Sequence, residues 1–216
     1  MTARPIIMGV DLSGPSNHAD TACALFESAG DVLVYQRHLA HLADSDVLHL
    51  VDGATRGASL TVGLDAPLSY QDGGGDRIRD RELRRRLQKA GMPSGSVMTP
   101  TMTRMAYLTL RGLSISRLIS TVHPSAAVLE VHPFGALALA GAPVEAVRSV
   151  KQSEKARTVV AHWLRQHGVE GLPDQDYSDH ELAALAAGFA AWKWQLGNAA
   201  WLADAEPPLH PYPFAC

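Results

Sequence analysis

Short apolar runs alternate with longer amphipathic segments along this chain, a pattern typical of an α/β domain. The first run, residues 6–10, closes on Asp11 and is broken soon afterwards by a Gly-Pro pair, so we predict a buried strand with Asp11 at its exit. Residues 21–27 and 32–37 are rich in strand formers and flank Gly30-Asp31, which predicts a hairpin. The sheet should therefore begin with three antiparallel strands.

Two later apolar runs repeat the placement of an acid at a strand exit. Residues 60–64 follow a short predicted helix and end at Asp65-Ala66-Pro67. Residues 127–131 carry Glu130 next to their end, and Pro133 follows. We therefore expect a mixed sheet, with three antiparallel strands followed by parallel ones and flanked by helices, in which three strands end with a carboxylate.

Four longer segments predict helices around this sheet. The first, residues 77–90, is highly charged and should lie mostly in solvent. Thr99-Pro100 predicts the cap and first residue of the second helix. The third covers residues 153–167. The fourth begins at Ser178 with a capping-box pattern and runs toward Gly197.

The length of the chain fits one domain. We assign residues 1–205 of the 216 to a single α/β domain, and residues 206–216, which are rich in proline, to an extended tail. Hydrophobic residues make up 46% of the sequence and charged residues 19%, which is ordinary for a chain with a sizeable buried core.

Charge and cysteine content narrow the possible functions. The net charge of −3 and the pI near 6.3 argue against broad attraction to nucleic acid, so contact with a nucleic acid or another phosphoester would have to be local. Cys23 and Cys216 form neither a disulfide framework nor a paired metal-ligand motif, which favours a reducing cytoplasm. The apolar run in the first eight residues is too short for a signal peptide or a spanning helix, so we expect no membrane association.

The three strand-end acids point to a metal site. Parallel strands bring their carboxyl ends to one edge of a sheet, so we expect Asp11, Asp65 and Glu130 to converge within about 8 Å. Like charges there repel unless a cation neutralises them, and carboxylate oxygens suit Mg²⁺ or Mn²⁺. Two such ions can activate water and stabilise the leaving oxygen of a phosphodiester, which predicts nuclease chemistry.

Each candidate also has a structural interpretation. A single Asp after a strand, such as Asp11, is commonly a turn former. Asp179 lies in the first turn of the last helix, where the helix dipole favours a negative charge with or without a metal. His132 is the best histidine candidate, because it lies two residues beyond Glu130 and on the same side of the strand. The other histidines, His180 included, are weaker candidates.

Several basic residues could bind an anionic substrate. Arg77 and Arg84 belong to a basic stretch on the charged helix, and Lys151 lies just before the helix over residues 153–167. Such charges are often only a solvated helix face. We nevertheless expect Arg84 and Lys151 to face the acidic edge of the sheet, because an anionic substrate needs cations beside the metal.

A set of short motifs extends over most of the chain: Gly9-Val10-Asp11, Leu64-Asp65-Ala66-Pro67-Leu68, Arg77 with Asp80 and Arg84, Thr99-Pro100, Glu130-Val131-His132-Pro133, Lys151, and Asp179-His180-Glu181-Leu182. With these motifs the sequence resembles the family labelled domain of unknown function 429, described as predicted nucleases with a ribonuclease H-like fold. The resemblance implies that fold and a metal-dependent phosphodiester hydrolysis, with the three strand-end acids as metal ligands.

The last helix departs from the family pattern. Ala183-Ala184 stands where members tend to have an Asp followed by Ala. Asp179 lies four residues earlier on the same helical face and could move the carboxylate by one turn, about 5.4 Å along the axis. We therefore include Asp179 with Asp11, Asp65 and Glu130 in the expected catalytic and metal-binding set.

Two other classes of function stay open. The actin and sugar-kinase superfamily uses a related fold and also begins with an Asp after its first strand, so a phosphotransferase or ATPase is one alternative. That class needs two such domains to clamp ATP, and Gly14-Pro15 would form a poor phosphate-cradling turn. The other alternative is a module that binds nucleic acid or nucleotide without turnover, which Ala183 favours.

Overall fold

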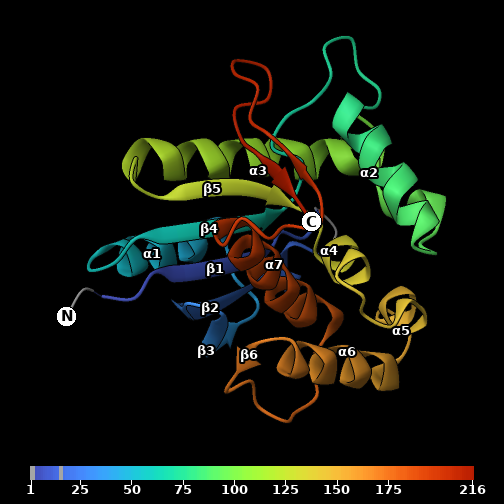
Figure 1. Cartoon of the computed structure of the whole chain (residues 1–216). Coiled ribbons are helices and arrows are strands. Elements are labelled where there is room, and N and C mark those ends of the chain that lie inside the picture. The colour runs from blue at the N-terminus through green and yellow to red at the C-terminus, as the bar shows by residue number, and fades with distance from the viewer. Residues whose placement is uncertain (1–2, 15–16) are drawn as a thin grey trace.

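An eight-stranded mixed sheet forms the centre of the protein in a computed structural model that describes residues 3–14 and 17–216. Pro15, part of the expected break after the first strand, lies outside the described residues. The strand order is β6-β3-β2-β1-β4-β5-β8-β7 (Figure 1). The strands are β1 (Ile6–Asp11), β2 (Ala22–Ala29), β3 (Val32–Leu39), β4 (Leu60–Asp65), β5 (Ala127–Val131), β6 (Val169–Glu170), β7 (Leu202–Ala203) and β8 (Phe214–Ala215).

The pairing of the long strands confirms the mixed sheet that the sequence predicts. β1 pairs with β2 and β2 with β3 in antiparallel fashion, and Gly30, with φ of 69°, lies in the turn of the hairpin. β4 is parallel to β1, and β5 is parallel to β4. The short strands β6, β7 and β8 were not predicted, because two residues are too few to show a period in the sequence.

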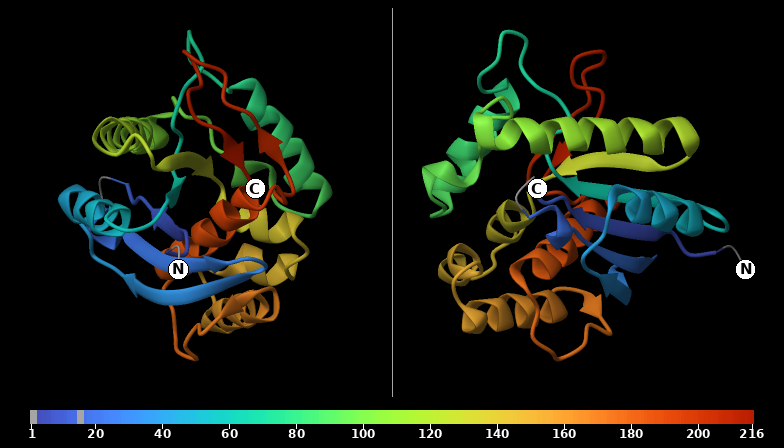
Figure 2. Two further views of the ribbon diagram at one scale, coloured as in Figure 1. Left: turned by 60° about the vertical axis from the view of Figure 1, so that its left-hand side comes forward. Right: turned by 180° about the vertical axis from the view of Figure 1, so that it is seen from behind.

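Helices cover both faces of the sheet (Figures 1 and 2). One face packs its apolar side chains against α1 and α3, and the other against α7 with α4, α5 and α6. No helix in the described part of the chain is long and apolar enough to cross a membrane. The helices are α1 (Asp44–Thr55), α2 (Ile78–Lys89), α3 (Thr103–Val122), α4 (Pro133–Leu139), α5 (Val144–Ser149), α6 (Glu154–Gln166) and α7 (Asp179–Gln195), with 3-10 turns η1 (His18–Asp20) and η2 (Ser94–Ser96).

The backbone of α7 lies directly on β1 and β4. A Cβ atom at Gly9 would come within 2.1 Å of the Ala184 carbonyl oxygen and 2.2 Å of the Gly188 nitrogen. A Cβ atom at Gly63 would come within 2.8 Å of the Ala187 carbonyl oxygen. Only small residues on both surfaces allow this approach. The contact fixes the first turn of α7 beside the carboxyl ends of the two strands.

The prediction that Thr99-Pro100 opens a helix is wrong, because α3 begins at Thr103. The Thr99 hydroxyl instead donates a hydrogen bond to the carboxylate of Asp76, which also accepts two hydrogen bonds from Arg84. The side chain that would have capped the helix is therefore used to close the preceding loop.

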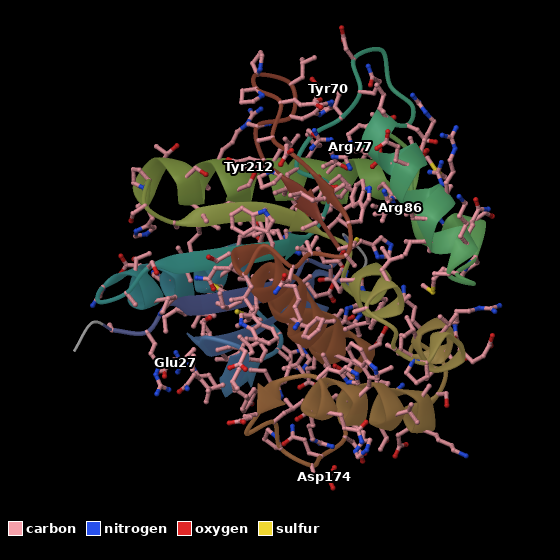
Figure 3. All side chains as sticks on the ribbon, viewed as in Figure 1. Glu27, Tyr70, Arg77, Arg86, Asp174 and Tyr212 are labelled. Carbon is pink, nitrogen blue, oxygen red and sulfur yellow. The ribbon has the colours of Figure 1, made fainter. Side chains whose placement is uncertain are left out.

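The charged helix α2 is solvated on one face only. Arg86 is exposed on its outer side, whereas Arg77, at its N-cap, is 1% exposed (Figure 3). Arg79 and Asp80 are buried as well. The expectation of a mostly solvated helix is wrong at its first turn, because ion pairing there allows charged residues to be buried.

The last eleven residues turn back onto the sheet. β8 pairs with β5 in parallel and with β7 in antiparallel fashion, and Phe214 and Cys216 are buried. A backbone bridge between Glu206 and His210 closes the turn before it. The segment that we expected as an extended tail therefore adds a strand beside β5, next to the site described below.

Candidate functional site

Asp11 and Asp65 form a pair of neighbouring carboxylates at the ends of β1 and β4. They are direct partners in the parallel pairing, so their side chains leave the same face of the sheet. Burial raises the pKa of Asp11 above its ordinary value and raises the pKa of Asp65 well above it. The charge of Asp11 raises the pKa of Asp65 further, while Lys151 lowers it. Such a pair favours a proton or a cation between its members.

The first turn of α7 brings a histidine to this pair. Ser178 caps the helix, because its hydroxyl accepts a hydrogen bond from the Glu181 nitrogen and its own nitrogen donates to the Glu181 carboxylate, as the capping box predicts. His180 Nδ1 lies 2.6 Å from Asp11 Oδ2, and this hydrogen bond raises the pKa of His180. A carboxylate can only accept, so Nδ1 is the donor. The adjacent Asp179 adds negative charge that raises the pKa of Asp11.

A buried arginine from α3 holds the loop that follows Asp11. Arg111 Nη1 donates to the Ser13 carbonyl oxygen and to the Thr21 hydroxyl, each at 2.8 Å. Its Nη2 lies 2.6 Å from a carboxylate oxygen of Asp44 in α1. These contacts tie the exit of β1 to both helices on that face, so the position of Asp11 depends partly on a side chain that no motif singles out.

Glu130 leaves the opposite face of the sheet from the two aspartates. Its partner on β4 is Leu64, the residue before Asp65, and side chains of successive strand residues point to opposite faces. Glu130 therefore reaches the common edge from the α3 side. Its charge still raises the pKa of Asp65, so the two groups are close enough to interact.

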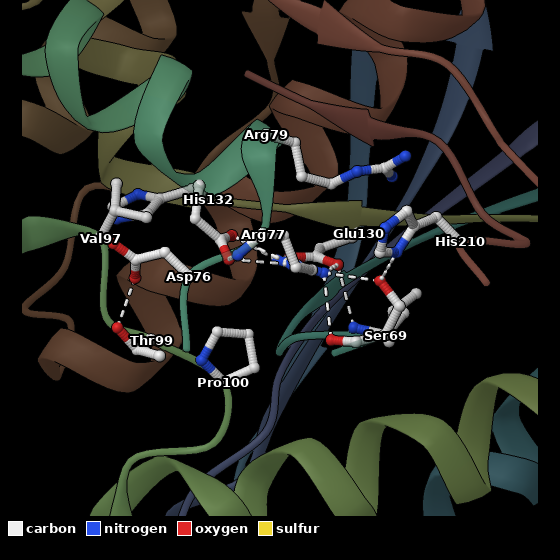
Figure 4. Close-up of polar contacts among 12 residues, drawn as sticks. Ser69, Asp76, Arg77, Arg79, Val97, Thr99, Pro100, Glu130, His132 and His210 are labelled. Carbon is white, nitrogen blue, oxygen red and sulfur yellow. Dashed lines mark hydrogen bonds and ion pairs between the residues drawn. The ribbon is translucent and has the colours of Figure 1, made fainter. Parts of the chain in front are cut away.

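The Glu130 carboxylate is neutralised within the protein (Figure 4). Oε1 accepts a hydrogen bond from Arg77 Nη2 at 2.5 Å, and Oε2 accepts from Arg77 Nη1 at 2.7 Å and from the Leu68 nitrogen at 2.9 Å. Arg77 also pairs with Asp80 at 2.6 Å and donates to Ser69. The Arg77 guanidinium, expected to bind substrate, is thus occupied by two buried carboxylates.

His132 fastens two segments of the chain together. Its Nδ1 accepts a hydrogen bond from the Gly135 nitrogen at 3.0 Å, which caps α4, so the proton is on Nε2, 2.6 Å from the Ser96 carbonyl oxygen. Burial lowers the pKa of His132, which keeps the ring neutral. Both ring nitrogens of this predicted substrate-binding residue therefore bond to the backbone.

The two remaining predicted cations have different positions. Arg84 does not line the cavity, so the expectation that it faces the acidic edge is wrong. Its guanidinium pairs with Asp76 at 2.5 Å and donates to the Val97 carbonyl oxygen at 2.8 Å, and the Arg84 bond lowers the pKa of Asp76 to about 2. Lys151 is exposed at the cavity and lowers the pKa of both Asp11 and Asp65.

One cavity of about 360 Å³ collects most of the predicted site. Among residues 3–14 and 17–216, no group of three or more His, Cys, Asp or Glu side chains is arranged to hold a metal ion. The predicted acids therefore share a cavity without forming one ligand group. Seven of the eight predicted site residues line it: Asp11, Asp65, Glu130, Asp179, Arg77, Lys151 and His132.

Sequence reasoning ranked His180 below His132, and the structure reverses their order at the aspartate pair. The signal that could have found His180 is its place in a capped first turn, next to Asp179. Sequence reasoning also missed the apolar side of the cavity, because Met92, Val97 and Met98 lie in the connection between α2 and α3, which has no helical or strand period.

The sequence matches the model of the family described as Protein of unknown function (DUF429) over residues 9–207. No curated protein matches the chain.

Proposed function

This chain belongs to the DUF429 family, and from the chemistry of its cavity we propose that it is a hydrolase that cleaves phosphoester bonds with a divalent cation, Mg²⁺ or Mn²⁺. The observation that carries the proposal is the Asp11–Asp65 pair, in which burial and mutual repulsion raise the pKa of Asp65 well above its ordinary value. A phosphodiester of nucleic acid is the substrate class that the family resemblance implies.

A ribonuclease H-like topology is part of the proposal. The order β3-β2-β1-β4-β5, with three antiparallel strands followed by two parallel ones, supports it. So does the position of an acid at the end of β1 and of its direct partner at the end of β4. Cys23 and Cys216 are buried thiols, which supports a reducing compartment such as the cytoplasm.

The donor set at the pair fits a hard cation. Mg²⁺ is commonly held by one or two carboxylates and keeps several of its waters, so Asp11 and Asp65 suffice as protein ligands, with Asp179 near enough to interact with Asp11. We leave Glu130 out of this set, because Arg77 and a backbone N–H already satisfy its oxygens. When bound, the cation would lower the pKa of a water and offset the charge on the phosphoryl group.

The chain's own residues would bind and orient the reactants. His180 donates to Asp11 and so fixes the direction of that carboxylate, as outer hydrogen bonds do at metal sites. Lys151 places a positive charge at the cavity for the phosphate. In hydrolysis the oxygen of water bonds to phosphorus, the bond from phosphorus to the ester oxygen breaks, and that oxygen leaves with a proton.

A binding role without turnover is the second candidate. Two features favour it. Glu130 is already neutralised by Arg77. Ala183 lines the cavity at the position where the family resemblance implies a carboxylate. In that case the cation and the anionic ligand would bind, and no bond would be cleaved.

Hydrolysis of bis(4-nitrophenyl) phosphate and of labelled oligonucleotides, with Mn²⁺ and with a chelator, separates the two candidates. The proposal predicts cleavage that requires the cation. It also predicts that Lys151→Glu weakens binding of the anionic substrate by about tenfold. Lys155→Glu is the matched control, since this exposed lysine of α6 does not line the cavity. An equal loss of substrate affinity in both variants would show that Lys151 does not bind the substrate.

A further inference from the structure

We propose that the cavity takes a small phosphoester carrying one flat apolar group, and that a nucleic-acid duplex is not its substrate. The inference rests on the proposed phosphoester function and adds the class of ligand. It comes from the part of the cavity that the carboxylates do not occupy.

The apolar side of the cavity is built from two directions. The connection from α2 to α3 supplies Met92, Val97 and Met98, and α4 and the end of α5 supply Phe134 and Val150. Met92, Val97 and Val150 are buried and form the inner part of this apolar wall, while Met98 is 37% exposed at its outer edge. Flexible methionines and an aromatic ring suit a flat apolar group more than a charged backbone.

Hydrogen bonds to the backbone hold this wall in place. His132 Nε2 donates to the Ser96 carbonyl oxygen at 2.6 Å, and Arg84 Nη2 donates to the Val97 carbonyl oxygen at 2.8 Å. Arg84 is itself fixed by its ion pair with Asp76. The apolar surface is therefore formed before a ligand arrives, which reduces the ordering that binding requires.

Size and charge both favour a small ligand. The volume of about 360 Å³ is in the range of small-molecule pockets, which are mostly apolar with a few placed polar groups. Of the three arginines and lysines at the cavity, Arg77 is neutralised by buried carboxylates. The other two are Lys151 and Arg148, and Arg148 pairs with the exposed carboxylate of Glu145 at 3.1 Å, a contact that solvent screens. Two exposed cations fit one phosphoryl group, whereas a duplex would need a longer basic track.

Binding of phenyl phosphate and of methyl phosphate, each with Mn²⁺ and measured by calorimetry, tests the inference. We expect phenyl phosphate to bind at least tenfold more tightly, because only its ring reaches the apolar wall. Met98→Gln should reduce that preference about threefold. Met105, in the first turn of α3, also lines the cavity, and Met98→Gln with Met105→Gln should reduce the preference about tenfold. Met102→Gln is the matched control: this methionine is 50% exposed and does not line the cavity, so the preference should stay unchanged.

Hydrolysis assays on the same protein separate failure of the inference from failure of the proposed function. Tight binding of phenyl phosphate without cleavage of bis(4-nitrophenyl) phosphate would support the ligand class and reject hydrolysis. Cleavage of duplex oligonucleotides, with equal affinity for phenyl and methyl phosphate, would overturn the ligand class and keep hydrolysis. If neither phosphate binds with Mn²⁺, the inference is wrong.

Discussion

Replacing Asp65 by Asn should stabilise the metal-free protein. Asp11 and Asp65 are direct partners on neighbouring parallel strands, which lie about 4.8 Å apart. Two unit charges at that distance repel by about 3.5 kcal/mol at an effective dielectric constant of about 20. Protonation relieves part of this repulsion in the wild type, since the pKa of Asp65 is raised well above its ordinary value. We therefore expect a gain of about 1–3 kcal/mol.

The sign of this gain follows from proton linkage. A carboxyl whose pKa is raised on folding binds more protons in the folded than in the unfolded state, so the stability of the metal-free wild type falls as the pH rises from 3.8 toward the folded pKa of Asp65. Asn does not titrate and removes this loss. The difference between variant and wild type should accordingly be largest at neutral pH and should vanish below about pH 3.

Thermal melts in chelator measure the stability of the metal-free proteins, and melts in Mn²⁺ measure how much the cation stabilises each of them. In chelator the variant should melt about 3–10 °C above the wild type. Mn²⁺ at about a hundred times its dissociation constant should stabilise the wild type by about 2.7 kcal/mol and the variant by much less. Asp72→Asn, which removes an exposed charge in a loop, should change neither melt. A lower melting temperature for Asp65→Asn in chelator would refute the argument from repulsion.

Three further predictions concern the framework of the site. Arg77→Met should destabilise the protein by about 3–5 kcal/mol in urea melts, because it leaves two buried carboxylates unpaired, whereas Arg84→Met should cost about 1 kcal/mol; equal losses would contradict the buried network. Gly9→Ala should cost about 3 kcal/mol by displacing α7, while Gly53→Ala in α1, where a Cβ atom meets nothing, should gain up to about 1 kcal/mol by the same measurement. The contribution of Asp76, about 1 kcal/mol after solvent screening, should be present above pH 3.8 and lost as the pH falls through about 2, so Asp76→Asn and wild type should converge in acid.

The strands of the sheet could be predicted from the sequence because the patterns that indicate a strand lie within a few neighbouring residues. The runs before Asp11 and Asp65 have the apolar pattern of buried strands, and the capping box at Ser178 marks the start of α7. Parallel pairing then brings strand ends to one edge whatever the details of packing. Asp11, Asp65 and Glu130 line one cavity for this reason.

The roles of individual residues depended on long-range partners that no local pattern contains. Glu130 pairs with Leu64, the residue before Asp65, so its side chain leaves the other face of the sheet. Arg77, at the N-cap of α2, donates hydrogen bonds to its carboxylate. Arg84 is used by a loop aspartate, and His180 reaches Asp11 only because α7 lies close on the sheet at Gly9. Register and helix contact decide these pairings, and both appear only in three dimensions.

Calorimetric titration of the metal-free protein with Mn²⁺ tests the central claim most directly. The account predicts that at least one ion binds to the wild type, that binding releases protons because the pKa of Asp65 is raised, and that Asp65→Asn abolishes the signal while Asp72→Asn preserves it. Absence of binding to the wild type, or equal binding to Asp65→Asn, would contradict the assignment of the Asp11–Asp65 pair as a cation site.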